Sequence, residues 1–230
     1  MKTIGLIGGM SWQSSKSYYE FTNMRVKELI GGSHSAKSIM VSVNFSDIER
    51  YTFQDNWIEI GRMMVAAARQ LEHAGADIVL LCTNTIHLIS EAIVESISVP
   101  FLHIADATGK AIQAKRINKI ALLGTKFTME MDFYRKTLED KYHIDVLIPD
   151  QDDRQIVHDI IYSELVKGIF TEESKQKCLE IIRNLKLNGA EGVILGCTEL
   201  PLLIPESDLD IPSFDTAKIH ANQAVDWALK

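Results

Sequence analysis

Residues 75–85 read GADIVLLCTNT and residues 189–199 read GAEGVILGCTE, so one pattern occurs twice in the chain, at an offset of 114 residues. In each copy a glycine precedes a continuous apolar run, and small polar or thiol side chains follow it. Continuous apolar runs are typical of strands in a parallel sheet, because helices cover both faces of such a sheet. The two copies therefore predict two buried strands with polar side chains at their carboxyl ends.

Two further pairs of segments repeat in the same order. Residues 4–8 (IGLIG) resemble residues 120–124 (IALLG) at an offset of 116, and residues 99–101 (VPF) resemble residues 211–213 (IPS) at an offset of 112. A nearly constant offset indicates an internal repeat. We predict one domain over 1–100 and a second over 101–211. Residues 101–116 would form a crossover, and residues 212–230 would return to the first domain.

Strand-like and helix-like segments alternate along the chain. The strand candidates are residues 3–7, 38–43, 78–81, 101–103, 119–123, 145–148, 193–195 and 213–214. The helix candidates are residues 13–29, 57–74, 85–97, 105–115, 128–142, 154–167, 172–188 and 216–228. This alternation predicts an α/β fold of two pseudo-symmetric, doubly wound parallel-sheet domains. Ligands of such sheets bind at the carboxyl ends of the strands, so we expect the site in the cleft between the domains.

Composition excludes several classes of function. The chain has 230 residues and a net charge of −7, which is the opposite of the basic surface that binding to nucleic acid requires. No apolar run approaches the ~20 residues that span a membrane, and no signal-peptide pattern precedes the first strand. Three cysteines are too few for a disulfide framework, so we expect a cytoplasmic protein. Neither metal-ligand spacing nor a dinucleotide glycine pattern is present, so we expect no metal and no nicotinamide cofactor.

The residues after the repeated strands could carry proton-transfer chemistry. The repeat aligns Cys197 with Thr83 and Thr198 with Asn84. A thiol at the start of a helix is expected to have a lowered pKa, which suits it to removing and returning a proton. Asn84, Thr85 and Thr198 could donate to the carboxylate of an amino acid whose α-carbon loses that proton. The pattern favours inversion of a stereocentre next to a carboxylate.

The chain resembles the aspartate/glutamate racemase family over essentially its whole length. The resemblance rests on the LIGGM sequence of residues 6–10, on Asn84 and Thr85 followed by His87, on the GCTE sequence of residues 196–199, and on the repeat. It implies two pseudo-symmetric α/β domains, an amino-acid substrate, no cofactor and a homodimer. It also implies two cysteines that act as paired acid and base.

One position departs from that family pattern. The first catalytic cysteine of the family directly precedes Asn-Thr, and here that position is Thr83, with Cys82 one residue earlier. A shift of one residue at a strand end turns the side chain to the other face, so we expect Cys82 in the core. A subset of the family has this Thr/Cys pairing. The resemblance therefore implies Cys197 as the main acid and base, with Thr83, or a water that it holds, on the opposite face.

The resemblance also bears on substrate recognition. Arg50 and Lys167 match basic positions of the family and could hold the distal carboxylate of aspartate or glutamate, although both could equally be solvated surface charges. Met10 could line the substrate. Glu199 could contact the substrate, tune the Cys197 thiol or cap a helix. The helical pattern around Cys178 predicts that this cysteine is buried.

Two alternatives stay open. A single functional thiol also fits the decarboxylases and isomerases of the same superfamily, in which one cysteine protonates one face of a carbanion. The basic pair Arg50 and Lys167 argues against that reaction, because its pocket would be more apolar. A non-catalytic homologue that binds a small ligand is the third possibility, and Thr83 is the residue that supports it.

Overall fold

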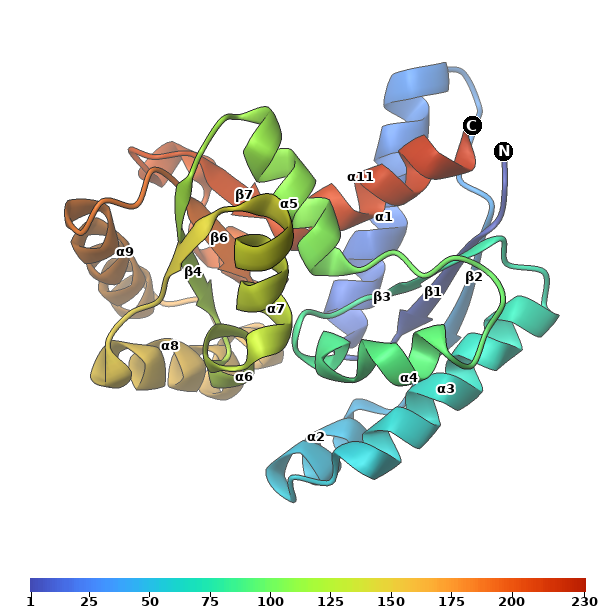
Figure 1. Ribbon diagram of the computed structural model, residues 1–230, viewed down its shortest axis with the longest axis horizontal. Coiled ribbons are helices and arrows are strands. Elements are labelled where there is room, and N and C mark those ends of the chain that lie inside the picture. Colours follow the sequence, from blue (N-terminus) through green and yellow to red (C-terminus); the bar gives the residue numbers. More distant parts are fainter. The chain divides into compact units, whose positions relative to one another are not determined.

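The computed structural model describes residues 1–230 and divides them into two compact units, each built on a parallel sheet (Figure 1). The first unit comprises Met1–Ile104 and His220–Lys230, and the second comprises Ala105–Ile219. The chain thus leaves the first unit, builds the whole of the second, and returns. The Lys2 N–H donates to the carbonyl of Ala228 at 2.8 Å, which joins the two ends of the chain within the first unit.

The sheet of the first unit has three parallel strands in the order β2-β1-β3, where β1 is Ile4–Gly8, β2 is Ser38–Ser42 and β3 is Ile78–Leu81. All residues of β1 and β3 are buried. The surrounding helices are α1 (Trp12–Ile30), α2 (Phe45–Phe53), α3 (Trp57–His73), the 3-10 helix η1 (Thr85–Ile89), α4 (Ser90–Val94) and, at the carboxyl end, α11 (Thr216–Ala228).

Both faces of this sheet are covered. On one face Ile7, Val79 and Leu81 pack in a cluster with Ile60 and Met64 of α3. The alternate strand residues, which include Leu6 and Leu80, point to the other face and are fully buried as well. Figure 1 shows α1 and α3 on opposite sides of the sheet. The continuous apolar runs of the sequence follow from this double burial.

The sheet of the second unit has four parallel strands in the order β5-β4-β6-β7. Its strands are β4 (Lys119–Gly124), β5 (Asp145–Leu147), β6 (Val193–Gly196) and β7 (Ser213–Asp215). The main helices are α5 (Ile104–Ala114), α6 (Lys126–Glu130), α7 (Asp132–Lys136), α8 (Gln151–Ser163), α9 (Glu172–Leu187) and α10 (Leu200–Leu203). Short turns complete the unit: the π-helical η2 (Thr137–Lys141) and the 3-10 helices η3 (Leu165–Lys167) and η4 (Glu206–Asp208).

The repeated sequences occupy corresponding places in the two sheets. In the first unit β1 pairs with β3, and in the second unit β4 pairs with β6. These are the two strand pairs that the sequence repeat identifies. The prediction of two parallel-sheet α/β units is therefore confirmed.

Several predicted elements differ from the structure. Residues 101–103 are not a strand, because only Phe101 forms a bridge, to Val79, before the chain enters α5. The single helix predicted over 128–142 is broken into α6, α7 and η2, since Met131 has extended backbone angles. The helix predicted over 85–97 is η1 followed by α4. Helix α2 was not predicted, because it is only nine residues long and only Ile48 and Thr52 are buried in it.

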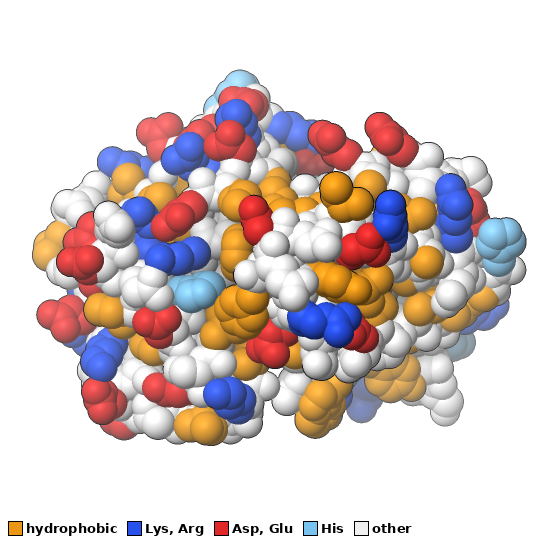
Figure 2. Space-filling view, turned by 90° about the horizontal axis from the view of Figure 1, so that it is seen from below, with side chains coloured by type: hydrophobic (Ala, Val, Ile, Leu, Met, Phe, Trp, Pro, Cys, Tyr) orange, Lys and Arg blue, Asp and Glu red, His pale blue; other side chains and the backbone are white.

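None of the helices combines the length and the apolar composition that crossing a bilayer demands. On the face of the protein drawn in Figure 2, acidic and basic side chains are interspersed among apolar ones.

Gly9 and Gly61 differ in whether their surroundings and backbone angles permit a side chain. Gly9 has a φ of 94°, and a Cβ there would lie 2.1 Å from the carbonyl oxygen of Val43, whereas Gly61 lies inside α3 with nothing within 4 Å of an added Cβ. We expect Gly9→Ala to lower the free energy of unfolding by about 1–3 kcal/mol and Gly61→Ala to raise it by up to about 1 kcal/mol. Thermal unfolding followed by circular dichroism measures both. Equal effects of the two substitutions would contradict this account.

Candidate active site

The end of β1 turns sharply into α1 in the first unit. Ser11 caps α1, because its Oγ accepts the N–H of Ser14 at 3.2 Å. Ser15 Oγ accepts the N–H of Gly9 at 2.7 Å and donates to the carbonyl of Ser11 at 3.0 Å. Met10 is buried within this turn. The turn is therefore fixed by the hydroxyl groups of Ser11, the N-cap residue, and Ser15, in the first turn of α1.

The end of β3 presents Thr83, Asn84 and Thr85. Cys82 is fully buried, and its carbonyl accepts the hydroxyl of Ser14 at 2.6 Å. Burial raises the pKa of the Cys82 thiol far above its usual range. The prediction that Cys82 lies in the core is confirmed. Thr83 is half-buried, and Asn84 and Thr85 are buried where η1 begins.

His87 fixes the backbone of Thr83. Its Nε2 accepts the N–H of Ile104 at 3.2 Å, so its Nδ1 carries the proton and donates to the carbonyl of Thr83 at 2.8 Å. Burial, followed by the neighbouring His103 and His220, holds the pKa of His87 well below its usual value. His87 is thus an uncharged side chain whose two hydrogen bonds connect the residues after β3 with Ile104, the first residue of α5.

His220 lies beside His87 in the first unit. Its ring lies 5.7 Å from that of His87. Its Nε2 donates to the carbonyl of Leu102 at 2.8 Å, and its Nδ1 accepts the hydroxyl of Tyr18 at 2.8 Å. Burial lowers the pKa of His220 to about 3. The sequence repeat gave no sign of this contact between α1 and α11.

The end of β6 in the second unit presents Cys197, Thr198 and Glu199 together. Gly196 ends the strand beside Gly124 of β4, and a Cβ on Gly196 would lie 2.8 Å from a carbonyl oxygen of β4. Cys197 is 9% exposed and Glu199 is 5% exposed. The Cys197 thiol donates to Glu199 Oε2 at 3.1 Å, and the Thr198 hydroxyl donates to the same oxygen at 2.6 Å.

The expected low pKa of the Cys197 thiol is wrong. Burial, followed by the negative charge of Glu199, raises the pKa of this thiol well above its ordinary value. The backbone N–H groups of Glu199 and Leu200 do lower it, as a helix start should, but they are outweighed. The resting form of Cys197 at neutral pH is therefore the neutral thiol.

The two predicted cations are both exposed. Arg50 lies on α2 with 55% of its side chain exposed, and it forms an ion pair with Asp47 at 3.0 Å. Its guanidinium also lies over the ring of Tyr51, at 4.7 Å from the centroid. Lys167 ends η3 and is exposed. Asp47 lies three residues before Arg50 on the same helix, so the ion pair is local to α2.

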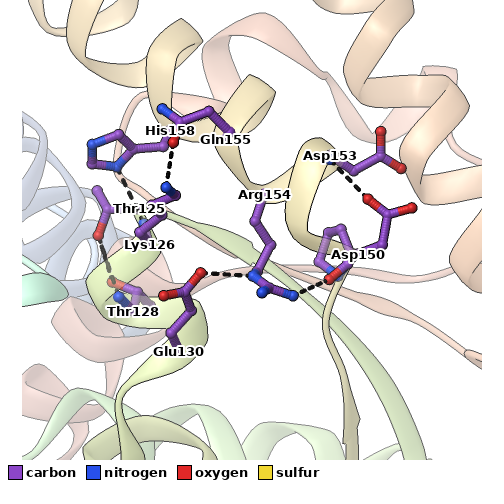
Figure 3. A network of polar contacts seen from close by, with 10 residues as sticks. Thr125, Lys126, Thr128, Glu130, Asp150, Asp153, Arg154, Gln155 and His158 are labelled. Atoms are coloured by element: carbon purple, nitrogen blue, oxygen red, sulfur yellow. Dashed lines mark hydrogen bonds and ion pairs between the residues drawn. The ribbon is translucent and has the colours of Figure 1, made fainter.

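Hydrogen bonds and an ion pair that were not predicted from the sequence connect α8 with α6, the helix that follows β4 (Figure 3). The N–H of Lys126 donates to His158 Nδ1 at 3.2 Å, and Lys126 Nζ donates to Gln155. Arg154 of α8 pairs with Glu130 of α6 at 2.7 Å. The signal available in the sequence was that this turn follows residues 120–124, the repeat of β1. In residues 1–230, no group of three or more His, Cys, Asp or Glu side chains is arranged to hold a metal ion.

Comparisons with known proteins agree on one family. The model of the family described as Asp/Glu/Hydantoin racemase matches residues 7–224. The broad specificity amino-acid racemase RacX of Bacillus subtilis is 25% identical over 223 residues, which are 96% of each chain. A solved structure from Yersinia pestis, of a protein designated provisionally as an Asp/Glu racemase, is 46% identical with a TM-score of 0.93. An aspartate racemase homologue of Pyrococcus horikoshii is 34% identical with a TM-score of 0.87. Each of these two comparisons covers 100% of this chain and 100% of the other protein's chain.

A variant of arylmalonate decarboxylase is also similar, at 14% identity and a TM-score of 0.58, covering 98% of this chain and 93% of its own. At that identity the likeness is one of fold alone.

The buried histidines predict a loss of stability in acid. Below about pH 6.5 the unfolded chain protonates these rings while the folded protein does not, so the free energy of unfolding falls as the pH decreases. The loss from His220 continues down to its folded pKa of about 3. Each such ring adds up to about 1.4 kcal/mol per pH unit to the slope. Urea unfolding between pH 7 and pH 4 measures it.

His220→Gln keeps a donor and an acceptor at this position but removes the titration, so we expect its slope to be shallower. The control variant His34→Gln makes the same substitution at an exposed histidine instead of a buried one. A wild-type slope in His220→Gln would contradict the assignment.

Proposed function

Because the chain belongs to the Asp/Glu/hydantoin racemase family, we propose that it is an isomerase, an amino-acid racemase that exchanges the α-proton without pyridoxal phosphate. The observation that carries the proposal is the group formed by Cys197, Thr198 and Glu199 at the end of β6, in a chain matched by the family model over most of its length. A thiol is among the side chains suited to moving a carbon-bound proton.

The proposed substrate is aspartate, glutamate or a related amino acid. The names of racemases that are similar to this chain support that class. We assign Arg50 and Lys167 to the distal carboxylate. The contact of Arg50 with Asp47 uses Nη2, and a guanidinium has five N–H donors, so the ion pair leaves donors for a carboxylate.

The α-carboxylate needs donors, because the charge of the carbanion spreads onto it. We assign this role to Asn84, Thr85 and Thr198, and a wall of the substrate site to Met10. Cys197 exchanges the proton on one face of the α-carbon, and Thr83, directly or through a water that it holds, serves the opposite face. His87 supports Thr83 through its hydrogen bond to the Thr83 carbonyl. Glu199 lies beside the reacting thiol.

Thr83 favours a second candidate, a decarboxylase or isomerase of the same superfamily that uses a single cysteine. One thiol suffices to protonate one face of a carbanion, and the likeness to arylmalonate decarboxylase supports the compatibility of the fold. A protein that binds amino acids without turnover is the third candidate.

Incubation with L- and D-amino acids in D₂O tests these candidates. We expect racemisation with deuterium at the α-carbon, followed by NMR, and we expect Cys197→Ser to lower the rate by at least about 100-fold. The control Cys178→Ala removes a buried thiol of α9 and should retain most of the activity. Release of CO₂ from a malonate would favour the decarboxylase, and binding without exchange the third candidate. Full activity in Cys197→Ser would contradict the role of this thiol.

The assignment of Arg50 predicts selective loss of acidic substrates. We expect Arg50→Met to raise KM for aspartate and glutamate by about 10-fold or more and to leave KM for neutral amino acids unchanged, since a charge-assisted carboxylate contact is lost. Arg62→Met is a matched control, because Arg62 is 71% exposed and pairs with Glu59 three residues earlier, as Arg50 pairs with Asp47. Equal changes for both substrate classes would contradict the assignment.

A further inference from the structure

Cys197 and Glu199 form a buried thiol–carboxylate pair. The sulfur lies 3.1 Å from Glu199 Oε2, and both side chains are at least nine-tenths buried. We propose that Glu199 is the proton acceptor of the Cys197 thiol, and that this transfer makes Cys197 the base that attacks the α-proton. The inference rests on the proposed racemase function and gives Glu199 a role at the sulfur rather than at the substrate.

The orientation of Glu199 supports this role. Glu199 occupies the residue before α10, where a carboxylate usually caps the helix, but its side chain makes no capping hydrogen bond. Oε2 instead accepts the Cys197 thiol and the Thr198 hydroxyl. The carboxylate is thus aimed at the sulfur, and the alternative that it serves as a helix cap is excluded.

Charge explains why the acceptor is needed. A thiolate formed by losing its proton to water would face an ionised carboxylate at 3.1 Å, in surroundings that exclude most water. Two negative charges at that distance repel each other strongly. When the proton moves from sulfur to Glu199 instead, the pair keeps a single negative charge. The thiolate can then form without ionising two neighbouring groups.

The step balances as follows. The S–H bond of Cys197 breaks and an O–H bond forms on Glu199. The thiolate then takes the α-proton, so the S–H bond is restored and the electron pair of the C–H bond stays on the α-carbon, delocalised into the substrate carboxylate. The pair has gone from one negative charge to none, and the substrate has gained one. The reverse transfer returns a proton to carbon, or deuterium once the thiol has exchanged with D₂O.

Two readouts on Glu199→Gln test the proposal. The first is the pH at which alkylation of Cys197 by iodoacetamide reaches half its maximal rate, measured by mass spectrometry of the Cys197 peptide. The second is exchange of the α-proton of aspartate and glutamate in D₂O. We expect the alkylation midpoint to fall by about one pH unit or more, because the substitution removes the negative charge of the carboxylate next to the thiol. We expect exchange to fall by at least about 100-fold, because the proton acceptor is lost.

Thus the substitution should make the thiol easier to ionise and the enzyme slower. Glu206→Gln removes an exposed carboxylate from the same unit and should change neither readout. Glu199→Asp keeps an acid on a shorter side chain and should exchange at an intermediate rate, which guards against a Gln variant that fails to fold.

Three results would overturn the proposal. An unmoved alkylation midpoint in folded Glu199→Gln would show that the carboxylate does not act on the thiol. Exchange within about threefold of the wild type would show that Glu199 is not the acceptor. A wild-type protein that exchanges no amino acid would overturn the racemase function and the role of the pair at the α-carbon, while a lowered midpoint would still identify Glu199 as the group that controls the thiol.

Discussion

Burial of strands β1, β3 and β6 on both faces determines where polar chemistry can occur beside them. Every residue of β1, β3 and β6 is buried, so the strands themselves carry only apolar side chains and glycine. Along these three strands, polar side chains appear only after the strand ends, where the chain turns toward the next helix. Ser11, Thr83 and Cys197 all lie within three residues of such an end. The location of the candidate site follows from the packing of the core.

The same burial controls the ionisation of the groups at those ends. Burial holds His87 and His220 neutral. Each ring also has a donor and an acceptor partner, so neither enclosed imidazole is left unsatisfied. The Cys197 thiol is held neutral as well, by burial and by Glu199. A resting site without a thiolate is protected from adventitious oxidation and alkylation. Its reactivity must then be generated during turnover.

The sequence repeat predicts the central strands of both sheets, whereas it predicts the chemistry of the candidate site only in part. The apolar runs of residues 78–81 and 193–195 predict their strands because double burial leaves a strong local signal. Helix α2 leaves a weaker signal, since it has nine residues and buries only Ile48 and Thr52, while Phe53 is exposed. The pKa of Cys197 could not be derived from its place before a helix. It depends on the direction taken by the Glu199 side chain and on the depth of burial, and both are set by tertiary packing.

The chain leaves the first unit, forms the whole of the second and then returns, and this order affects folding during synthesis on the ribosome. His220, which holds Tyr18 and Leu102, belongs to the first unit but lies beyond the whole of the second unit in the sequence. A ribosome delivers residues in order, so the second unit has emerged completely before His220 can pack against Tyr18 of α1. The first unit therefore cannot be completed until the chain has passed through the whole of the second unit. Until α11 has been synthesised, the space that His220 fills beside Tyr18 of α1 stays open to chaperones and proteases.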